Sequence, residues 1–381
     1  MIVKCNNCGG ALTYDISAKK LKCAYCASLF PVEEVHAEDS DSQNMKCHIV
    51  SCTSCGAELA VNNVESATFC IYCGQPAIVF HRVSKMLKPQ AIIPFSITKE
   101  EAVSLLRKRI KKGAFIPRGI KNFELERVNG IYIPFWVYDI KYSDKQILSG
   151  KCGKTRRSYL RKAEWNFKNV TLDASSKLYD TSSQRLEPFN MKDLVPFHEG
   201  YLSGFYADKY DQTASDLEEL AFKRCKEIFD NKLKNTVPAS SVYIKESHPK
   251  PKVLKCIYAL FPAWFLTLRY KGKAYTLLVN GQTGKIVGGL PFLVFKVILL
   301  FLSLFALLAP LLGSLISAIY EYFISRDAFS LFMWGYLFTS GFILFIGYCV
   351  LFSVKKHIKD TSTKEIEAFS KHRQKGDNSQ C

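Results

Sequence analysis

The sequence contains none of the short motifs that identify the common enzyme classes. It has no Gly-x-Ser-x-Gly elbow of a serine hydrolase, no His-Glu-x-x-His helix of a zinc protease and no phosphate-binding loop. GQTGK at 281–285 has two residues between its glycines and Ile286 after its lysine, so we interpret it as part of a hairpin that turns at Asn280 and Gly281. The seven histidines are scattered. These absences indicate a protein that is not an enzyme.

The amino terminus also lacks an apolar run ahead of its first cysteine, so it does not show the pattern of a secretory signal. We therefore expect the amino-terminal region in a reducing cytoplasm, where paired cysteines more often bind metal than form disulfides. Acidic residues are too few to balance the basic ones: 34 Asp and Glu stand against 52 Lys and Arg, a formal net charge of +18. Such a balance favours an anionic partner, which is a nucleic acid, an acidic lipid headgroup or an acidic protein.

One cysteine pattern occurs twice. Two C-x-x-C pairs are separated by fourteen residues, and the whole frame repeats 47 positions later. Each pair presents two thiolates to one tetrahedral metal ion, and a site made of four cysteines is closed to substrate. The pattern predicts zinc ribbons at 1–30 and 47–80, joined by an acidic linker at 31–46, with rubredoxin-like iron or thiol redox chemistry as the alternative. The expected ligands of the two structural zinc ions are Cys5, Cys8, Cys23, Cys26, Cys52, Cys55, Cys70 and Cys73.

Two stretches rich in aromatic and branched residues resemble each other at an offset of 128 positions. YIPFWVYDIKY at 132–142 aligns with LFPAWFLTLRY at 260–270, and a Pro, a Trp and a Tyr recur at matching places. This composition is typical of a strand buried against a helix. We therefore predict two related helix-plus-antiparallel-sheet units, at 81–210 and 211–290, the first enlarged by a basic insertion.

A helix is predicted ahead of each aromatic strand. The first begins with a capping box formed by Thr98 and Glu101. For the second we predict a capping box at Ser215 and Glu218. The spacing of apolar residues in the second helix predicts that it buries Leu217, Leu220, Ala221 and Ile228.

The insertion KCGKTRRSYLRKAEW at 151–165 is among the densest runs of positive charge in the chain. Its Tyr159 and Trp165 are suited to stacking on nucleic-acid bases. Basic loops near a bilayer bind acidic headgroups instead, and a charged run is also compatible with a solvated face. These three interpretations stay open. The candidate residues for an anionic partner are Lys154, Arg156, Arg157, Arg161 and Lys162.

Two runs near the carboxyl end, 297–319 and 328–354, contain no charged residue. At about 1.5 Å per helical residue, each is long enough to cross a hydrocarbon core of about 30 Å. Lysines flank the pair on its outer sides, and the positive-inside rule then places both termini in the cytoplasm. The runs predict a transmembrane hairpin, an integral protein of the bacterial plasma membrane with two spans, and a cytoplasmic tail at 355–381.

The duplicated C-x-x-C pairs, together with IPFWVYD, PFHEGYLSGFYADKYD and LLVNGQTGKIVGGLP ahead of the apolar runs, resemble a family of bacterial zinc-ribbon membrane proteins. Members are commonly labelled as containing a zinc ribbon like that of transcription factor IIB, or as similar to the primosomal replication-restart helicase. The resemblance implies the architecture and no particular activity. A helicase needs a nucleotide-binding loop and motor domains, which this sequence lacks, so the likeness to that enzyme is confined to the cysteine spacing.

The predicted fold class is therefore α+β, with two amino-terminal four-cysteine zinc ribbons, a duplicated helix-plus-antiparallel-sheet domain and a carboxyl-terminal two-helix transmembrane hairpin. The predicted function is that of a membrane-anchored, non-enzymatic zinc-binding adaptor or scaffold, whose cytoplasmic double-ribbon head binds a protein partner. The alternative is a membrane protein that binds nucleic acid in connection with replication or transcription. Thiol redox chemistry at a ribbon is a third hypothesis, which requires a cysteine that titrates while metal is bound.

Overall fold

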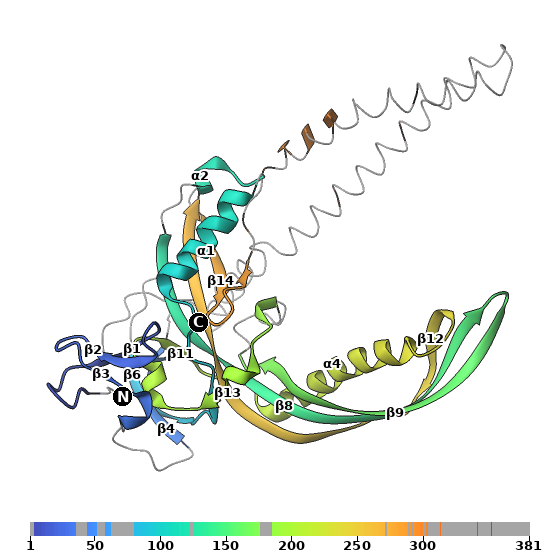
Figure 1. Cartoon of the computed structure of the whole chain (residues 1–381), viewed down its shortest axis with the longest axis horizontal. Helices are drawn as coiled ribbons and strands as arrows, with labels where there is room; N and C mark the ends of the chain where they lie inside the picture. The colour runs from blue at the N-terminus through green and yellow to red at the C-terminus, as the bar shows by residue number, and fades with distance from the viewer. Residues whose placement is uncertain are drawn as a thin grey trace, which may run out of the picture.

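The computed structural model describes residues 4–35, 44–51, 58–61, 80–113, 115–121, 125–175, 185–270 and 273–288, and single residues between 290 and 352. Its centre is a long antiparallel sheet. Strand β8 (Leu125–Cys152) pairs with β9 (Thr155–Asp173) on one edge and with β13 (Lys250–Tyr270) on the other. These strands bend strongly along their length and extend on one side into an arm that ends at the β8–β9 turn (Figure 1).

The remaining strands complete one small and one large sheet. The small sheet consists of β1 (Leu12–Asp15), β2 (Lys20–Cys23) and β3 (Leu29–Phe30) and is followed by the 3-10 turn η1 (Val32–Glu34). The large sheet has 12 strands. Besides β8, β9 and β13 it contains β4 (Asn44–Ser51), β5 (Glu58–Val61), β6 (Phe80–Leu87), β7 (Ala91–Ile92), β10 (Val195–Pro196), β11 (Tyr206–Asp208), β12 (Ser240–Ser247), β14 (Lys273–Asn280) and β15 (Ile286–Val287).

The large sheet contains two units with the same order of elements. One runs β7, α1 (Lys99–Lys112), β8, β9. The other runs β11, α4 (Ala214–Lys234), β13, β14, with β12 as an additional strand between α4 and β13. Each short strand pairs in parallel with the long strand of the other unit, because Ala91 lies opposite Ala259 and Tyr206 lies opposite Ile131. The two units therefore share a single sheet. Helix α2 (Arg118–Lys121) and the 3-10 turns η2 (Met191–Asp193) and η3 (Glu199–Leu202) lie in connections.

Both long helices begin with capping boxes, although the second cap differs from the predicted one. Thr98 and Glu101 form reciprocal hydrogen bonds at the start of α1, as the sequence predicted. At α4 the cap is Thr213 with Asp216, two residues before the predicted Ser215. The apolar ridge shifts accordingly, so that Ile228 is 49% exposed. The buried residues of α4 are Leu217, Ala221, Cys225, Phe229 and Leu233.

The turn after β14 is also longer than predicted. The amide of Asn280 donates to the carbonyl oxygen of Lys285, and Gly284 has a φ of 73°, which favours glycine. The side chain of Asn280 is fully buried, and its amide group donates to the carbonyl oxygen of Leu186. The side chain of Asn280 therefore anchors a neighbouring segment, which a two-residue hairpin turn would not require.

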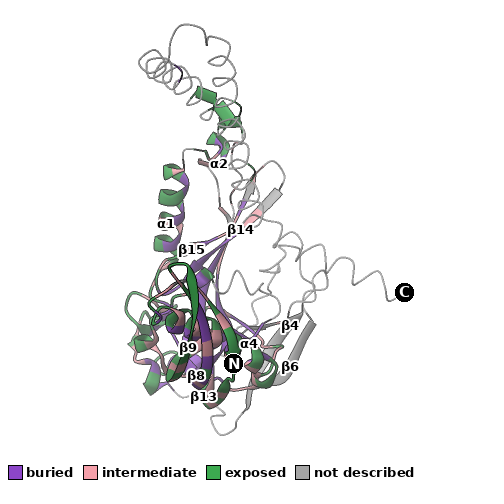
Figure 2. Cartoon of the chain, turned by 90° about the vertical axis from the view of Figure 1, so that its right-hand side faces the viewer, coloured by how far each residue is buried: buried purple, intermediate pink, exposed green. Residues whose placement is uncertain are grey.

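Two apolar clusters lie on the two faces of the sheet. On one face, Tyr132, Trp136 and Tyr142 of β8 pack in one core with residues of α1, α4 and the small sheet. On the other face, Ile133 and Phe135 pack with β13 residues and with the segment around Phe189. Buried residues accordingly follow β8 and β13, and exposed ones cover the outer side of α1 (Figure 2). The central sheet therefore contributes buried residues to a separate apolar cluster on each of its faces.

The predicted α+β class with a transmembrane hairpin is wrong. The described part of the chain is mostly strand. None of the helices in it combines the length and apolar composition that a bilayer crossing requires; the 21-residue α4 is amphipathic and carries charge along its exposed side. We therefore correct the prediction of two spans, of a plasma-membrane location and of a membrane or lipid-headgroup partner. Apart from single residues, 297–319 and 328–354 lie outside the described residues.

Candidate metal centre

Four cysteine sulfurs converge at the edge of the small sheet. Cys5 and Cys8 precede β1, Cys23 ends β2 and Cys26 follows it. The Sγ atoms of Cys5 and Cys26 are 3.6 Å apart, those of Cys8 and Cys23 are 3.4 Å apart, and all four lie within 4.8 Å of one another. Tetrahedral sulfurs about 2.3 Å from one zinc ion would be about 3.8 Å apart. The donor set therefore fits a four-coordinate metal ion of that size.

Backbone turns position the two pairs of cysteines. The amide of Cys5 donates to the carbonyl oxygen of Gly10, and Gly9, which has a φ of 71°, donates to the carbonyl oxygen of Cys5. The second knuckle closes in the same way, because the amide of Ala27 donates to the carbonyl oxygen of Cys23. Each C-x-x-C pair thus lies on a tight turn that directs both sulfurs to one point.

The four thiols differ in exposure. Cys5 and Cys23 are buried, whereas Cys8 and Cys26 are exposed. Hydrogen bonding to the Ser28 hydroxyl and amide lowers the pKa of the Cys26 thiol to about 6. A lowered pKa favours the thiolate, which is the form that binds metal. Within the described ranges, these cysteines are the one group of three or more metal-binding side chains close enough to share an ion.

The first ribbon is docked against the large sheet. The amide of Tyr14 on β1 donates to the carbonyl oxygen of Ser203, and its ring contacts the Tyr201 ring at 5.2 Å between centroids. At Gly200 a Cβ would meet Val32 at 3.0 Å, so glycine permits this close approach. His198 caps η3, with its Nδ1 accepting from the Gly200 amide. The segment HEGYLSG at 198–204 therefore holds the ribbon in place.

The four cysteines of the second frame lie outside the described residues, and its metal site stays a prediction for Cys52, Cys55, Cys70 and Cys73. Strand β4 precedes these cysteines, β5 lies between the two C-x-x-C pairs and β6 follows them. Strand β4 pairs with both β5 and β6, and β5 pairs with β11 of the large sheet.

The candidate residues for an anionic partner lie at the far end of the arm, on both faces of the sheet. Lys154 is in the turn between β8 and β9. Arg156 lies opposite Lys151 and Lys162 opposite Lys145, whereas Arg157 lies opposite Gly150 and Arg161 opposite the buried Gln146. Side chains alternate between faces along a strand. The structure therefore brings Arg156 and Lys162 to one face and Arg157 and Arg161 to the other.

Comparison with known proteins gives one relative that decides the family. The uncharacterized protein YdjG of Bacillus subtilis (strain 168) is 31% identical over 308 residues, which cover 76% of this chain and 89% of YdjG. The chain belongs to the YdjG family. No family model and no solved structure matches the chain.

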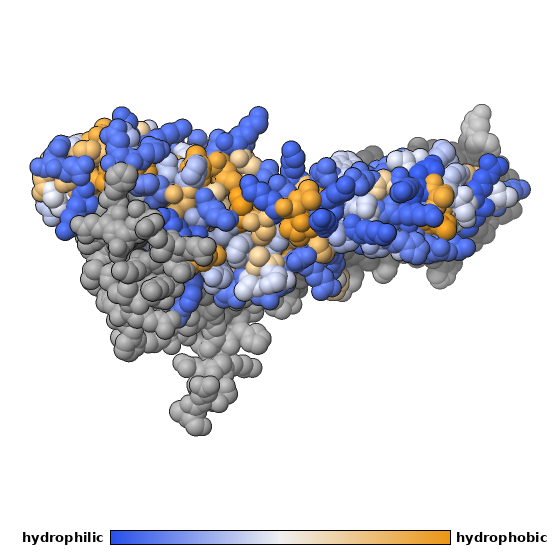
Figure 3. Space-filling view, turned by 90° about the horizontal axis from the view of Figure 1, so that it is seen from below, coloured by the Kyte–Doolittle hydropathy of each residue, from blue (hydrophilic) through white to orange (hydrophobic). Residues whose placement is uncertain are grey.

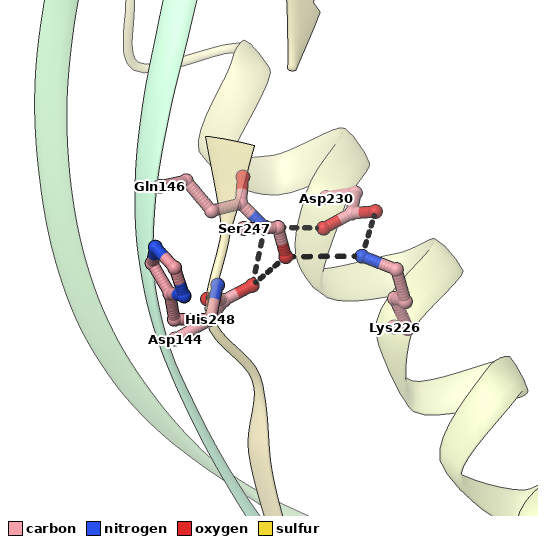
Figure 4. Close-up of polar contacts among 6 residues, drawn as sticks. All are labelled: Asp144, Gln146, Lys226, Asp230, Ser247 and His248. Atoms are coloured by element: carbon pink, nitrogen blue, oxygen red, sulfur yellow. Dashed lines mark hydrogen bonds and ion pairs between the residues drawn. The ribbon is translucent and has the colours of Figure 1, made fainter. Parts of the chain in front are cut away.

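This member of the YdjG family also contains a buried polar network between the arm and α4 (Figure 4). The Gln146 amide group donates to Asp144 at 2.7 Å and to Asp230 of α4 at 2.6 Å. The Ser247 hydroxyl donates to Asp144, and Lys226 forms an ion pair with Asp230 at 3.1 Å. Gln146 thus lies between two carboxylates and holds α4 on the arm. Sequence reasoning missed this network, although polar residues at two inward-facing strand positions were a signal of it.

A cavity of about 480 Å³ lies beside this network, between α4 and the long strands. Its walls combine Tyr142 with the acidic Glu219, the basic Lys223 and Lys226, and Pro251. Tyr142 is buried, and within the described part of the chain its hydroxyl makes no hydrogen bond. Because the charges in the wall are mixed and Lys226 is already paired with Asp230, the cavity favours no single class of ligand.

Proposed function

We propose that the protein is a non-enzymatic zinc-binding adaptor whose amino-terminal ribbons bind a protein partner. The observation that carries the proposal is the set of four cysteine sulfurs within 4.8 Å of one another. Four thiolate ligands leave no position for a water or substrate, so such an ion stabilises the fold without catalysing a reaction. A ribbon of this size has a small core, and zinc binding then supplies most of its folding free energy. Membership of the zinc-ribbon family and a second ion in the second frame are parts of the same proposal.

Two exposed apolar side chains on the first ribbon support the protein-partner part of the proposal. Tyr25, between Cys23 and Cys26, is 82% exposed, and Leu29 is 48% exposed. Tyrosine is enriched among the residues that dominate binding energy at protein interfaces. The inner residues of the ribbon, such as Leu21, are buried. Tyr25 and Leu29 are therefore the apolar surface that this ribbon offers to a partner.

Metal analysis of the purified full-length protein tests the zinc sites. We expect two zinc ions per chain, of which the double variant C5S/C23S loses one and C52S/C70S loses the other. The variant C152S, with a cysteine outside both frames replaced, is the matched control and keeps both ions. Iron in place of zinc would support the rubredoxin-like alternative. A full metal content in C5S/C23S would overturn the assignment of the first site.

Site-specific photo-crosslinking in cells tests the partner. A crosslinkable residue at position 25 is expected to give one defined adduct, and the same residue at Lys19, in the exposed turn between β1 and β2, is expected to give none. The adduct should disappear when C5S/C23S removes the metal, because the ribbon then loses its fold. Equal adducts from positions 19 and 25 would count against a binding surface at Tyr25.

Nucleic-acid binding is the second candidate function. One observation favours it, namely that a basic surface covers one face of the arm, far along the chain from the ribbon. The salt dependence of binding distinguishes the two candidates, since contacts to phosphates weaken steeply as the salt concentration rises.

A further inference from the structure

Three pairs of like-charged residues lie directly opposite one another on the arm. Lys141 of β8 is opposite Lys252 of β13. Lys145 is opposite Lys162 of β9, and Lys151 is opposite Arg156. In an antiparallel pair, directly opposed side chains are about 5 Å apart on the same face. These six residues of β8, β9 and β13 are here called the paired basic row.

All three pairs face away from α4. The even-numbered residues of β8 face this helix, because the Tyr142 ring contacts the Phe229 ring and Gln146 donates to Asp230. The odd-numbered residues, and the residues opposite them, therefore point to the other side. Helix α4 lies on the concave side of the arm, so the paired basic row is on the convex side (Figure 1). Seen from below, the arm is mostly hydrophilic, with small apolar patches (Figure 3).

Like charges directly opposite each other destabilise a sheet. Acidic residues on the same face offset part of this cost. Glu164 forms an ion pair with Lys141 at 2.8 Å. Asp139 lies opposite Lys255, and Glu246 lies opposite Ile147. The pairs Lys145–Lys162 and Lys151–Arg156 lie further along the arm, where the flanking turn adds Lys154. This concentration of positive charge on a solvent-facing surface is suited to an anionic partner.

We propose that the paired basic row binds the phosphate backbone of a single-stranded nucleic acid. At about 3.3 Å per residue, successive pairs are about 13 Å and about 20 Å apart along β8. A duplex, with a persistence length of about 50 nm, follows a curved face only at the cost of bending, whereas a single strand follows it without that cost. Between the second and third pairs, Tyr243 is 48% exposed and lies beside the Arg156 guanidinium, 5.1 Å from its ring centroid, so this surface offers an aromatic ring and a cation to an unstacked base.

The strand register also changes which basic residues are expected to bind the nucleic acid. Arg161 lies on the α4 side, and its guanidinium donates to the hydroxyl and carbonyl oxygens of Thr236, just beyond the end of α4. Arg157 shares that side of β9. The row instead includes Lys141, Lys145 and Lys252, which the charge density of the sequence did not single out. The inference deepens the second candidate function and rests on it.

Binding of full-length protein to a labelled oligothymidylate across a salt series tests the proposal. We expect the double variant K145Q/K162Q to weaken binding by roughly tenfold and to reduce the salt slope by about 1.4, since each lost contact to a single strand removes about 0.7. The matched control K108Q/K112Q, which removes two exposed charges from α1, should leave both quantities unchanged. A duplex of the same length should bind more weakly than the single strand.

Three results would overturn the inference: no binding at low salt, equal losses in both double variants, or equal binding of polyglutamate, which would identify an acidic protein as the partner. Zinc content measured on the same preparation keeps the proposals apart. A protein with its zinc ions that fails to bind the oligonucleotide contradicts this inference alone. A protein without zinc that still binds it contradicts the metal-based adaptor alone.

Discussion

Ile133 on β8 lies directly opposite Phe261 on β13, and the two residues are separated by the same 128 positions that align the two aromatic stretches. In an antiparallel pair of repeated strands, equivalent residues oppose each other only where a local twofold axis crosses the pair. The neighbouring pairs follow the same symmetry, because Tyr132 is opposite Pro262 as Pro134 is opposite Leu260. The two repeats therefore share one centre, and both Ile133 and Phe261 are fully buried there.

The symmetry exchanges the helices between the repeats, and two tryptophans make this testable. Trp136 donates to the carbonyl oxygen of Gln212, ahead of α4, and Trp264 donates to that of Ile97, ahead of α1. Each indole thus binds the backbone just ahead of the helix of the other repeat. We expect W136F and W264F each to lower the free energy of unfolding by about 2 kcal/mol, from the lost hydrogen bond and the lost ring volume. Urea denaturation followed by circular dichroism measures this.

The matched control for the tryptophans is W165F, at a ring that is 40% exposed on β9. We expect a change below about 0.5 kcal/mol there. A large loss in one core variant and none in the other would show that the two repeats do not contribute equally to the shared centre.

The helix caps give a second prediction, which separates the observed α4 cap from the predicted one. We expect T98A and T213A each to cost about 1 kcal/mol of stability, because each removes an acceptor for an unpaired amide of the first turn. S215A should cost clearly less than T213A, and S104A, on the exposed side of α1, should be nearly neutral. A larger effect of S215A than of T213A would restore the cap that the sequence predicted.

Local rules predicted the parts of the fold that depend on neighbouring residues. The Thr98 cap and the cysteine knuckle both follow from residues three positions apart. The α4 cap was misplaced because Thr213 with Asp216 and Ser215 with Glu218 satisfy the same local rule, and only the burial of Phe229 in place of Ile228 distinguishes them.

Features that depend on distant residues could not be predicted in this way. The length of β8 was missed because two of the inward-facing positions in its outer half are polar, Asp144 and Gln146, and this breaks the usual alternation of apolar and polar residues. The paired basic row was missed for a related reason. Its members come from three strands, and only the register brings Lys252 opposite Lys141. The docking of the ribbon on η3 is likewise a contact between distant segments.

Two thiols, the buried Cys225 and the half-buried Cys256, predict a loss of stability at alkaline pH. Burial raises the pKa of Cys225 on α4, and of Cys256 on β13, from 9.0 to about 11. The unfolded chain releases these protons first, so stability is fully present below about pH 9 and falls as the pH rises towards 11. For the fully buried Cys225 the loss is about 2 kcal/mol.

Urea denaturation of the wild type and of C225A across this alkaline range isolates the contribution of that thiol, because other groups titrate equally in both proteins. We expect the difference in unfolding free energy between them to shrink as the pH rises. A difference that stays constant would show that Cys225 ionises in the folded protein as readily as in the unfolded chain.

The position of Gln146 between Asp144 and Asp230 gives the last prediction. Its amide group donates to both carboxylates, so Q146E replaces a shared donor with a third negative charge in a buried site. We expect a loss of about 3 kcal/mol at neutral pH. The loss should diminish as the pH falls, since protonation of the introduced carboxyl restores a donor. Q146E/D230N should recover part of the stability, and E164Q, on the solvent-facing side of the arm, should change it little. If Q146E is as stable as the wild type, the network does not hold α4 on the arm.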